Sequence, residues 1–219
     1  MHISHETYHA TIFEGWQFPN EVDAQREFRK RLFIDELGWD LVQENGLEFD
    51  EFDTPNAVFC SLYLGDAIVG CWRAIRTTDE YLGKKIFPQL ATLRPYPVNP
   101  DIWEISRLGV IRHPQRPLSG QLIYALMFQF ACTHNVQSLC GVVSPIHNRN
   151  FLISGIKTRR YGPPQEVGRD ARGRPMTVFF GEIRMSDQLG GPLNNVLDAI
   201  KLLELQDDTL VLRRTPVSA

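Results

Sequence analysis

The segment WEISRLGVI (103–111) predicts a β-strand, and it is followed by SGQLIYALMFQFACTH (119–134) and LCGVVS (139–144). The second segment is apolar nearly all round, which predicts a buried helix with Ser119 as its N-cap. The third is a short apolar run, which predicts another strand. A strand–helix–strand order of this kind indicates an α/β fold.

The segments that follow continue the alternation. Asn148 and Gly155 are placed to cap and to end a short helix over 148–155. We expect a further strand over 176–185 and a final amphipathic helix over 194–206.

The first half of the chain predicts a helix and a hairpin. Residues 21–38 carry apolar side chains at helical spacing and end at Gly38, and the apolar runs 57–64 and 67–75 flank Gly65-Asp66. The polar, proline-bearing stretch 76–102 is long for a loop, and long loops in compact domains are often functional. We therefore expect one domain over residues 1–219, a three-layer α/β/α sandwich with a mixed central sheet.

Composition excludes several classes of protein. The chain has 219 residues, 43% of them hydrophobic, which is enough for a substantial core. A formal charge of −3 argues against a general binder of nucleic acid or membrane surfaces. There is no apolar run of about 18 residues and no signal-peptide pattern at the N-terminus, so we expect a cytoplasmic protein.

The cysteines indicate neither disulfides nor a metal site. They are widely spaced and lie in apolar runs, without a CxxC pair: Cys60, Cys71, Cys132 and Cys140. Buried free thiols in a reducing compartment are the best interpretation.

An acidic segment, GLEFDEFD (46–53), follows the first predicted helix. Its alternation indicates an extended segment in which Glu48 and Asp50 point the same way, about 7 Å apart. With Asp53 they form either a solvated turn or a pocket for a positively charged ligand. A calcium loop is disfavoured because the Asp-x-Asp-x-Asp-Gly order is missing.

Further charged residues occur in otherwise apolar surroundings. Arg29 lies four residues before Phe33 on one helical face, Arg73 lies mid-strand beside Trp72, and the 103–111 strand carries both Glu104 and Arg107. A single arginine or glutamate in a strand is better explained as an ion pair at a sheet edge. Because buried charges must be paired or bound to a ligand, the set together predicts a mixed-charge cavity.

The ordered motifs resemble the acyl-homoserine lactone synthases, the LuxI-type autoinducer synthases of bacterial quorum sensing. The resemblance rests on R-x-x-x-F-x-x-x-x-x-W (Arg29, Phe33, Trp39), E-x-D-x-x-D (Glu48, Asp50, Asp53), the arginine of a G-x-x-R strand (Arg73) and W-E-x-S-R (Trp103 to Arg107). Thr77, Thr78 and the segment Phe87 to Leu90 match as well, and the match runs from about residue 25 to 160.

The resemblance implies a fold similar to that of the GCN5-related N-acetyltransferases. It also implies a reaction in which the α-amine of S-adenosylmethionine is acylated from a thioester, carried by acyl carrier protein or coenzyme A. Lactonisation then expels methylthioadenosine (MTA), and no cofactor or metal is needed. The S-adenosylmethionine site is expected at Arg29, Phe33, Trp39, Glu48, Asp50, Asp53, Arg73 and Arg107.

Residue types fit that chemistry. Carboxylates pair with the cationic groups of S-adenosylmethionine, and an arginine holds its carboxylate bidentately. One such pair at 4 Å contributes about 4 kcal/mol at an effective dielectric near 20. Acylation needs the neutral amine, so Glu104 is the expected proton acceptor, with Asp50 or Asp53 as competing candidates and Arg107 also in the catalytic set.

Spacing within the 103–111 strand raises a geometric problem. Glu104 and Arg107 are three residues apart, which places them on opposite faces of a regular strand. Either the strand has a β-bulge there, a common feature beside active sites, or the two residues serve different layers; we favour the bulge.

The donor side is less defined. The stretch 112–120 has a single glycine, which makes a poor coenzyme A cradle but suits a phosphopantetheine arm. Residues expected along the acyl chain and pantetheine are Arg112, Ser119, Leu122, Met127, Val142, Ser144 and Phe151. A basic patch for an acidic carrier protein, or simply a solvated surface, is formed by Arg112, Arg116, Arg149, Lys157, Arg159 and Arg160.

Two other functions remain open at this point. One is an ordinary acyl-CoA-dependent N-acetyltransferase of the same fold, and the other is a module that binds S-adenosylmethionine without catalysis. Leu108, Ile75-Arg76 and Ile156 depart from the family pattern, and these departures leave the acyl specificity open.

Overall fold

The computed structural model describes residues 7–111, 116–188 and 190–209. Within these ranges the main sheet has nine strands in the order β11-β1-β4-β5-β6-β7-β10-β8, and β9 pairs with β10. The strands are β1 (Tyr8–Glu14), β4 (Val58–Leu64), β5 (Ala67–Arg76), β6 (Ile102–Val110), β7 (Ser138–Val143), β8 (Arg159–Arg160), β9 (Gln165–Arg169), β10 (Pro175–Arg184) and β11 (Glu204–Asp207). The sheet is mixed, because β1–β11 and β6–β7 are parallel pairs and the others are antiparallel.

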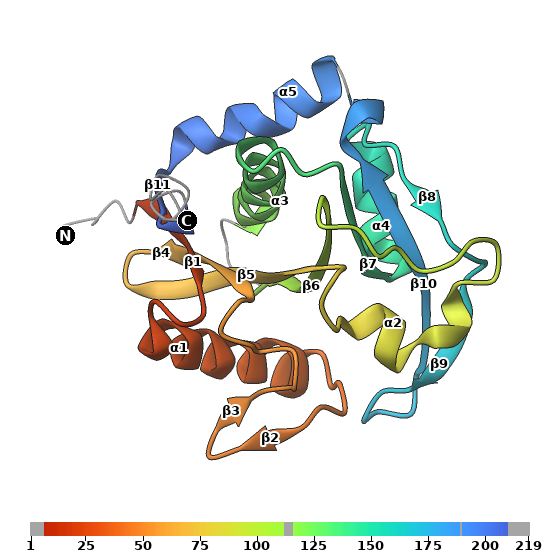
Figure 1. Ribbon diagram of the computed structural model, residues 1–219. Helices are drawn as coiled ribbons and strands as arrows, with labels where there is room; N and C mark the ends of the chain where they lie inside the picture. Colours follow the sequence, from red (N-terminus) through yellow and green to blue (C-terminus); the bar gives the residue numbers. More distant parts are fainter. Residues whose placement is uncertain (1–6, 112–115, 189, 210–219) are drawn as a thin grey trace, which may run out of the picture.

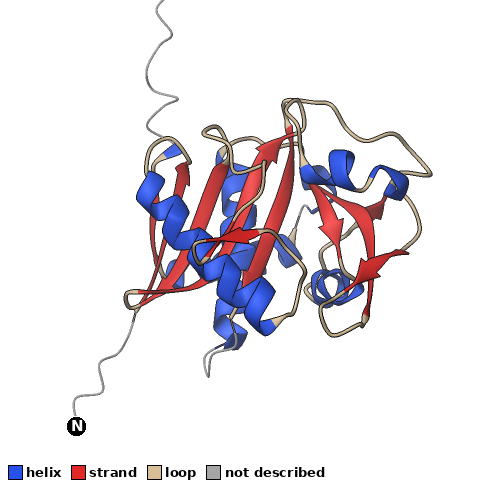
Figure 2. Cartoon of the chain, turned by 90° about the horizontal axis from the view of Figure 1, so that it is seen from below, coloured by secondary structure: helices blue, strands red, loops and turns tan. Residues whose placement is uncertain are grey.

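Helices cover both faces of the sheet (Figures 1 and 2). One face carries α1 (Pro19–Arg29), which continues as a π-helix, η1 (Lys30–Glu36), together with the small hairpin β2 (Gln43–Glu44) and β3 (Leu47–Glu48). The other face carries α3 (Arg116–Thr133), packed against the sheet and against α5 (Gly191–Leu197) and η4 (Asp198–Leu202). The remaining helices are α2 (Leu82–Ile86), η2 (Pro88–Leu90), α4 (Pro145–Ile153) and η3 (Met185–Gln188). The predicted α/β three-layer sandwich is confirmed.

The core explains why α3 is apolar nearly all round. Its Leu122, Leu126 and Phe130 are buried between the sheet and the C-terminal helices. Phe130 lies 5.4 Å from Trp72 and 5.3 Å from Trp103, measured between ring centroids. A helix covered on two sides has no polar face to present.

The sheet opens between β6 and β7. Their ladder pairs only Ile102, Trp103 and Glu104 with residues 138–140, and then ends. Beyond this point β6 stays with β5, and β7 stays with β10. The separation between the two groups of strands is visible in Figure 2.

The predicted bulge is present in β6. Cys71 pairs with Gly109 but Arg73 pairs with Ser106, so the register shifts by one residue at Arg107 and Leu108. Arg107 has φ +53°, in the left-handed region that non-glycine residues seldom adopt. The bulge directs the Arg107 side chain towards Glu48 and towards Asp50, which Arg73 also contacts.

Several local predictions were wrong. Ser119 lies inside α3 and is not its cap, since its hydroxyl lies 2.8 Å from that of Tyr8. Ser144, not Asn148, caps α4 by accepting from the His147 N–H at 3.4 Å. The expected helix over 194–206 ends at Leu202, because the next residues form β11 beside β1.

The thiols follow the prediction in part. Cys60, Cys71 and Cys140 are buried and free, whereas Cys132 is exposed. Among the described residues, no group of histidine, cysteine and carboxylate side chains is arranged to hold a metal ion. In the described part of the chain, no helix is both long enough and apolar enough to cross a membrane.

Candidate active site

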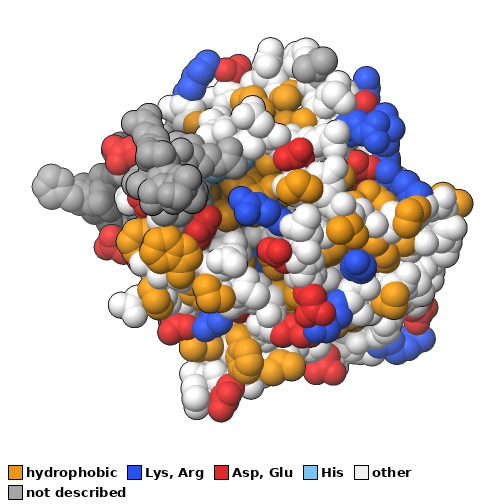
Figure 3. Space-filling model, in the orientation of Figure 1, with side chains coloured by type: hydrophobic (Ala, Val, Ile, Leu, Met, Phe, Trp, Pro, Cys, Tyr) orange, Lys and Arg blue, Asp and Glu red, His pale blue; other side chains and the backbone are white. Residues whose placement is uncertain are grey.

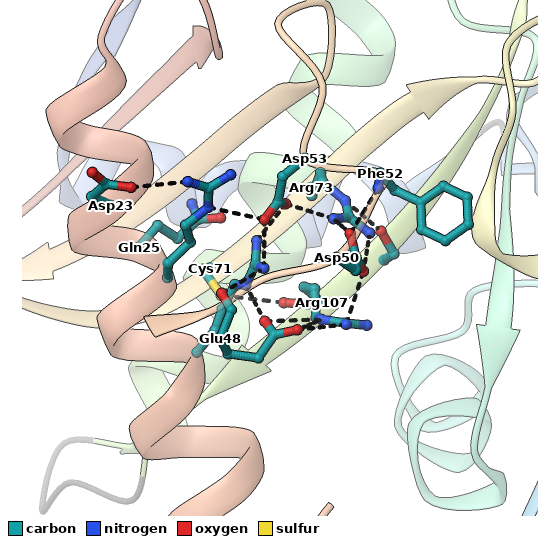
Figure 4. A network of polar contacts seen from close by, with 12 residues as sticks. Asp23, Gln25, Glu48, Asp50, Phe52, Asp53, Cys71, Arg73 and Arg107 are labelled. Atoms are coloured by element: carbon teal, nitrogen blue, oxygen red, sulfur yellow. Dashed lines mark hydrogen bonds and ion pairs between the residues drawn. The ribbon is translucent and has the colours of Figure 1, made fainter. Parts of the chain in front are cut away.

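A buried network of ion pairs joins α1, β3, the following turn, β5 and β6 (Figure 4). Arg29 is fully buried at the end of α1 and donates from Nε to Glu48 Oε2 at 2.5 Å. Its two terminal nitrogens donate to the Asp53 carboxylate at 2.7 and 2.8 Å. Arg29 therefore ties the first helix to both ends of the acidic segment.

Two more arginines belong to the network. Arg73 Nη2 donates to Asp50 at 3.0 Å and Nη1 donates to Asp53 at 2.6 Å. Arg107 Nη2 contacts Glu48 at 2.7 Å and Asp50 at 2.8 Å. Arg26 also donates to Asp53 at 3.1 Å and pairs with Asp23 at 2.9 Å. With this pair included, four arginines and four carboxylates balance in charge, so the acids are already paired within the protein and do not form a free acidic wall (Figure 4).

The pairing determines how the network titrates. Burial alone would raise the pKa of Asp53, but hydrogen bonds and charges from Arg29 and Arg73 outweigh it and hold that pKa well below its usual range. Burial would also raise the pKa of Asp50, but the charges and hydrogen bonds of Arg73 and the charge of Arg107 outweigh it and lower that pKa below its ordinary value. Both carboxylates are ionised at neutral pH.

An aromatic pair lies beside the network. Phe33 is buried in η1, and the Trp39 ring stacks on it with centroids 4.8 Å apart and an interplanar angle of 23°. The backbone N–H of Trp39 also donates to the Phe33 carbonyl at 2.8 Å. Trp39 remains 36% exposed, so one edge of the pair faces outwards.

A cavity of about 1160 Å³ runs from the charged network into the interior between β6 and β7. One end is lined by Phe33, Trp39, Asp50 and Arg107, and the other end by mainly apolar residues of α3, β7, α4 and β10. The predicted site residues on its wall are Phe33, Trp39, Asp50, Arg107, Met127, Val142, Ser144 and Phe151. Those behind the wall are Arg29, Glu48, Asp53, Arg73, Glu104, Ser119 and Leu122. Arg112 lies outside the described residues.

Glu104 is placed one layer behind the wall. It is fully buried, and its carboxylate accepts the backbone N–H groups of Leu82 and Gly83 at 2.9 and 2.7 Å. Burial raises the pKa of Glu104 to about 7, although these N–H groups and Arg73 act against the rise. Leu82 and Cys140, which pairs with Glu104 across the ladder, both line the cavity.

The autoinducer synthase family model matches residues 18–172. An acyl-homoserine-lactone synthase of Aeromonas hydrophila is 30% identical over 196 residues, which cover 86% of this chain and 92% of the relative. The chain belongs to the autoinducer synthase family. Both ends of the network, Arg29 and Arg107, lie inside the matched region.

Solved structures give the fold of the same family. BjaI, a CoA-dependent acyl-homoserine lactone synthase solved with MTA, superimposes with a TM-score of 0.78 at 21% identity, covering 91% of this chain and 93% of its own. A putative N-acetyltransferase from Lactobacillus plantarum superimposes with a TM-score of 0.52 at 15% identity, covering 81% of this chain and 99% of its own. The expected likeness of an autoinducer synthase to the acetyltransferase fold is confirmed.

Ser106 is the serine of the W-E-x-S-R motif, and the sequence of this autoinducer synthase did not indicate a role for it. It lines the cavity, and its hydroxyl accepts the Arg73 Nε–H at 3.1 Å. Its position directly before Arg107 is the one sequence feature that could have identified it. For the α2 N–H groups that bind Glu104, the unusual length of the 76–102 segment was the only sequence feature that pointed to a functional role.

The proposed basic patch is only partly a free positive surface. Arg149 and Lys157 are exposed, and Lys and Arg side chains gather along the edge of the synthase near β8 (Figure 3). However, Arg159 pairs with Asp187 at 2.7 Å, and the Arg160 guanidinium lies over the Phe179 ring at 4.6 Å. Arg112 and the Arg116 side chain lie outside the described residues.

Proposed function

We propose that the chain is an acyl-homoserine-lactone synthase that acylates S-adenosylmethionine from an acyl thioester. The observation that carries this proposal is the adjacent pair Arg107 and Asp50 on the cavity wall, 2.8 Å apart. A cation beside an anion is complementary to the carboxylate and ammonium of an amino acid head group. The apolar end of the same cavity suits an acyl chain.

The rest of the network positions this pair. Glu48 accepts from both Arg29 and Arg107, and Asp53 accepts from both Arg29 and Arg73. Ligand groups therefore meet side chains that are already ordered, so little entropy is lost on binding. Phe33 and Trp39 offer an aromatic face beside the head group, and a sulfonium over such a face gains about 0.5–1 kcal/mol.

The reaction is two successive substitutions. The neutral α-amine attacks the thioester carbonyl, a C–N bond forms, the C–S bond breaks and the thiol leaves. The carboxylate of the acylated intermediate then attacks the carbon next to the sulfonium, which closes the lactone and breaks the C–S⁺ bond to release MTA. One proton must leave the amine before or during the first step.

Two residues compete to accept this proton. Glu104 has a suitable pKa, about 7, but stands behind Leu82 and Cys140, so it acts through a water. Asp50 lies on the wall, but its lowered pKa makes it a weak base. We propose Glu104 as the acceptor and Asp50 as the group that orients the amine.

The donor is an acyl thioester on coenzyme A or on acyl carrier protein. A second structure of BjaI contains SAM and isopentyl-CoA, which supports coenzyme A as one possible carrier here. Apolar side chains such as Met127, Val142 and Phe151 line the end of the cavity where the acyl group would lie. No cofactor enters the reaction as written, because S-adenosylmethionine is consumed as a substrate.

The setting that we propose is the cytoplasm, and the unit that we propose is one domain over residues 1–219. Buried free thiols at Cys60, Cys71 and Cys140 support a reducing compartment. Each neighbouring pair of strands from β11 to β8 is hydrogen-bonded, including β6 and β7 at residues 102–104, which supports one folding unit.

Release of free thiol from an acyl-CoA or acyl-carrier donor, measured with and without S-adenosylmethionine, separates this function from its alternatives. The synthase releases thiol only when S-adenosylmethionine is present. An N-acetyltransferase would release thiol from acetyl-CoA with another amine and without S-adenosylmethionine. A non-catalytic module would bind S-adenosylmethionine but release no thiol with any donor.

A further inference from the structure

The turn between β9 and β10 is built as a rigid tip. Asp170 accepts the backbone N–H groups of Arg172 and Arg174 at 2.9 and 2.8 Å, and it pairs with the Arg174 side chain at 2.6 Å. The Asp170 N–H donates back to the Arg174 carbonyl at 2.9 Å, and the Gly173 N–H donates to the Asp170 carbonyl at 2.8 Å. These bonds order residues 170–174 without help from another element.

This tip reaches the opposite half of the molecule and binds the end of η1. The Ala171 N–H donates to the Gly38 carbonyl at 2.7 Å. Arg172 Nη2 donates to the Glu36 carbonyl at 3.0 Å, and Arg174 Nη2 donates to the Leu37 carbonyl at 3.4 Å. The last carbonyls of a helix lack intrahelical partners and carry partial negative charge, so arginine side chains are suited to bind them.

The contact closes one side of the cavity. Glu36, Leu37 and Trp39 line it from the η1 side, and Val167, Met176 and Val178 line it from the β9–β10 side. The two wall segments belong to different parts of the fold: β9 pairs with β10 in a hairpin, and η1 continues α1. The bonds from residues 171, 172 and 174 therefore bridge the two walls.

The same contact bears on the aromatic pair. Gly38 adopts φ +75°, and a Cβ built there would lie 3.4 Å from Arg172 Nε, so the arginine packs closely over this turn. Trp39 follows directly and stacks on Phe33. The backbone that aims Trp39 is thus held between its own helix and the hairpin tip.

We propose that residues 170–174 are a clasp that positions the wall segment Glu36–Trp39, and with it the Trp39 ring, for S-adenosylmethionine. The clasp residues touch no reacting atom and act through Trp39. The proposal rests on the proposed function only for the identity of the ligand. Release of the clasp frees the wall segment and weakens substrate binding, while the reacting groups stay in place.

The test compares Arg172→Ala with two controls, Arg172→Lys and Arg169→Ala. Lysine keeps a charged donor for the Glu36 carbonyl. Arg169 belongs to the same hairpin, but its Nη1 donates to the Gly173 carbonyl, inside the hairpin. All variants carry Trp16→Phe, since Trp16 is 52% exposed whereas Trp72 and Trp103 are buried. Acrylamide quenching of tryptophan fluorescence then reports mainly on Trp39.

We expect Arg172→Ala to increase quenching in the protein without substrate. The KM for S-adenosylmethionine should rise about fivefold, the effect of one lost hydrogen bond, while kcat changes less than twofold. Arg172→Lys should recover part of both effects, and Arg169→Ala should match the parent. The melting temperature of each variant separates positioning from general destabilisation.

Unchanged quenching and unchanged KM in both Arg172→Ala and the Arg172→Ala/Arg174→Ala double variant would overturn the clasp. A change in kcat without a change in KM would overturn it too, because the clasp acts on binding. If the parent protein shows no turnover, the proposed function fails, whereas the quenching comparison still decides whether the clasp holds Trp39.

Discussion

At the scale of the residue, Arg107 joins the strand distortion to the charge network. Its positive φ places it on a bulge, and its guanidinium bridges Glu48 and Asp50. A non-glycine residue in this region costs about 1–3 kcal/mol, which the surrounding ion pairs must offset. Backbone strain and the proposed recognition of the ligand therefore meet in one residue.

Arg107→Ala should abolish synthase activity and lower stability by about 3 kcal/mol. The loss follows because the buried Glu48 and the partly buried Asp50 each lose a cationic partner. Denaturant unfolding and turnover of S-adenosylmethionine measure the two effects separately. Arg107→Lys restores the charge without the bidentate geometry, so it should recover stability more than activity. Full activity in Arg107→Ala would contradict the assignment.

Asp50→Asn should weaken the binding of S-adenosylmethionine by at least tenfold. The substitution removes the carboxylate on the cavity wall that would pair with the ammonium, a charge-assisted bond of about 1.5–3 kcal/mol. Isothermal titration calorimetry measures the affinity, with Asp66→Asn in the exposed β4–β5 turn as the matched control. Unchanged affinity would mean that Asp50 serves only its arginine partners.

At the scale of the element, α2 depends on close packing over β6. A Cβ at Gly83 would lie 2.4 Å from a Phe180 ring carbon and 2.8 Å from Glu104 Oε1. Gly83→Ala should therefore displace α2, break its N–H bond to Glu104 and destabilise the protein by about 1–3 kcal/mol. Gly120→Ala in α3 meets no atom within 4 Å and should raise the melting temperature. Equal effects of the two substitutions on thermal unfolding would refute this packing argument.

The elements differ in how far their sequences predict them. The bulge in β6 was predictable, because Glu104 and Arg107 were both expected in one site although residues three apart lie on opposite faces of a regular strand. β11 was not, because residues 204–206 continue an amphipathic helical pattern and only the edge of β1 makes them a strand. β1 was likewise missed, since its pairing partners β4 and β11 lie far along the chain. β9 was missed because its sequence is polar, although its partner β10 follows directly after the turn.

At the scale of the whole molecule, the ion pairs were predictable as a set, but their partners were not. The motifs indicated buried arginines and carboxylates, yet no spacing shows that Arg29 binds Glu48 and Asp53 at once. The cavity wall was also beyond prediction. Leu122 and Met127 are both buried apolar residues of α3, but only Met127 faces the cavity.

The contribution of Asp50, Asp53 and Glu104 to the free energy of unfolding should pass through a maximum between about pH 4 and 5. Asp50 and Asp53 have lowered pKa values, so their stabilisation is present above about pH 4 and is lost as pH falls. Glu104 has its pKa raised from 4.5 to about 7, so the folded state loses about 3 kcal/mol as pH rises across that interval. Free energies of unfolding from pH 3 to 8 measure both slopes.

Glu104→Gln should flatten the slope between pH 5 and 7 and leave the acid limb in place. The same variant should lose most of its kcat, and the parent kcat should fall below about pH 7 as Glu104 becomes protonated. A Glu104→Gln enzyme with the parent pH–rate profile would move the proton acceptor to Asp50.

The proposed function places the joining of S-adenosylmethionine to an acyl thioester in this cavity. Its most direct test is mass spectrometry of the products formed by the purified protein with S-adenosylmethionine and a panel of acyl-CoA and acyl-carrier-protein thioesters. We expect N-acyl-homoserine lactone and MTA in equal amounts with at least one donor. Absence of both products with every donor, from protein that binds S-adenosylmethionine, would contradict it.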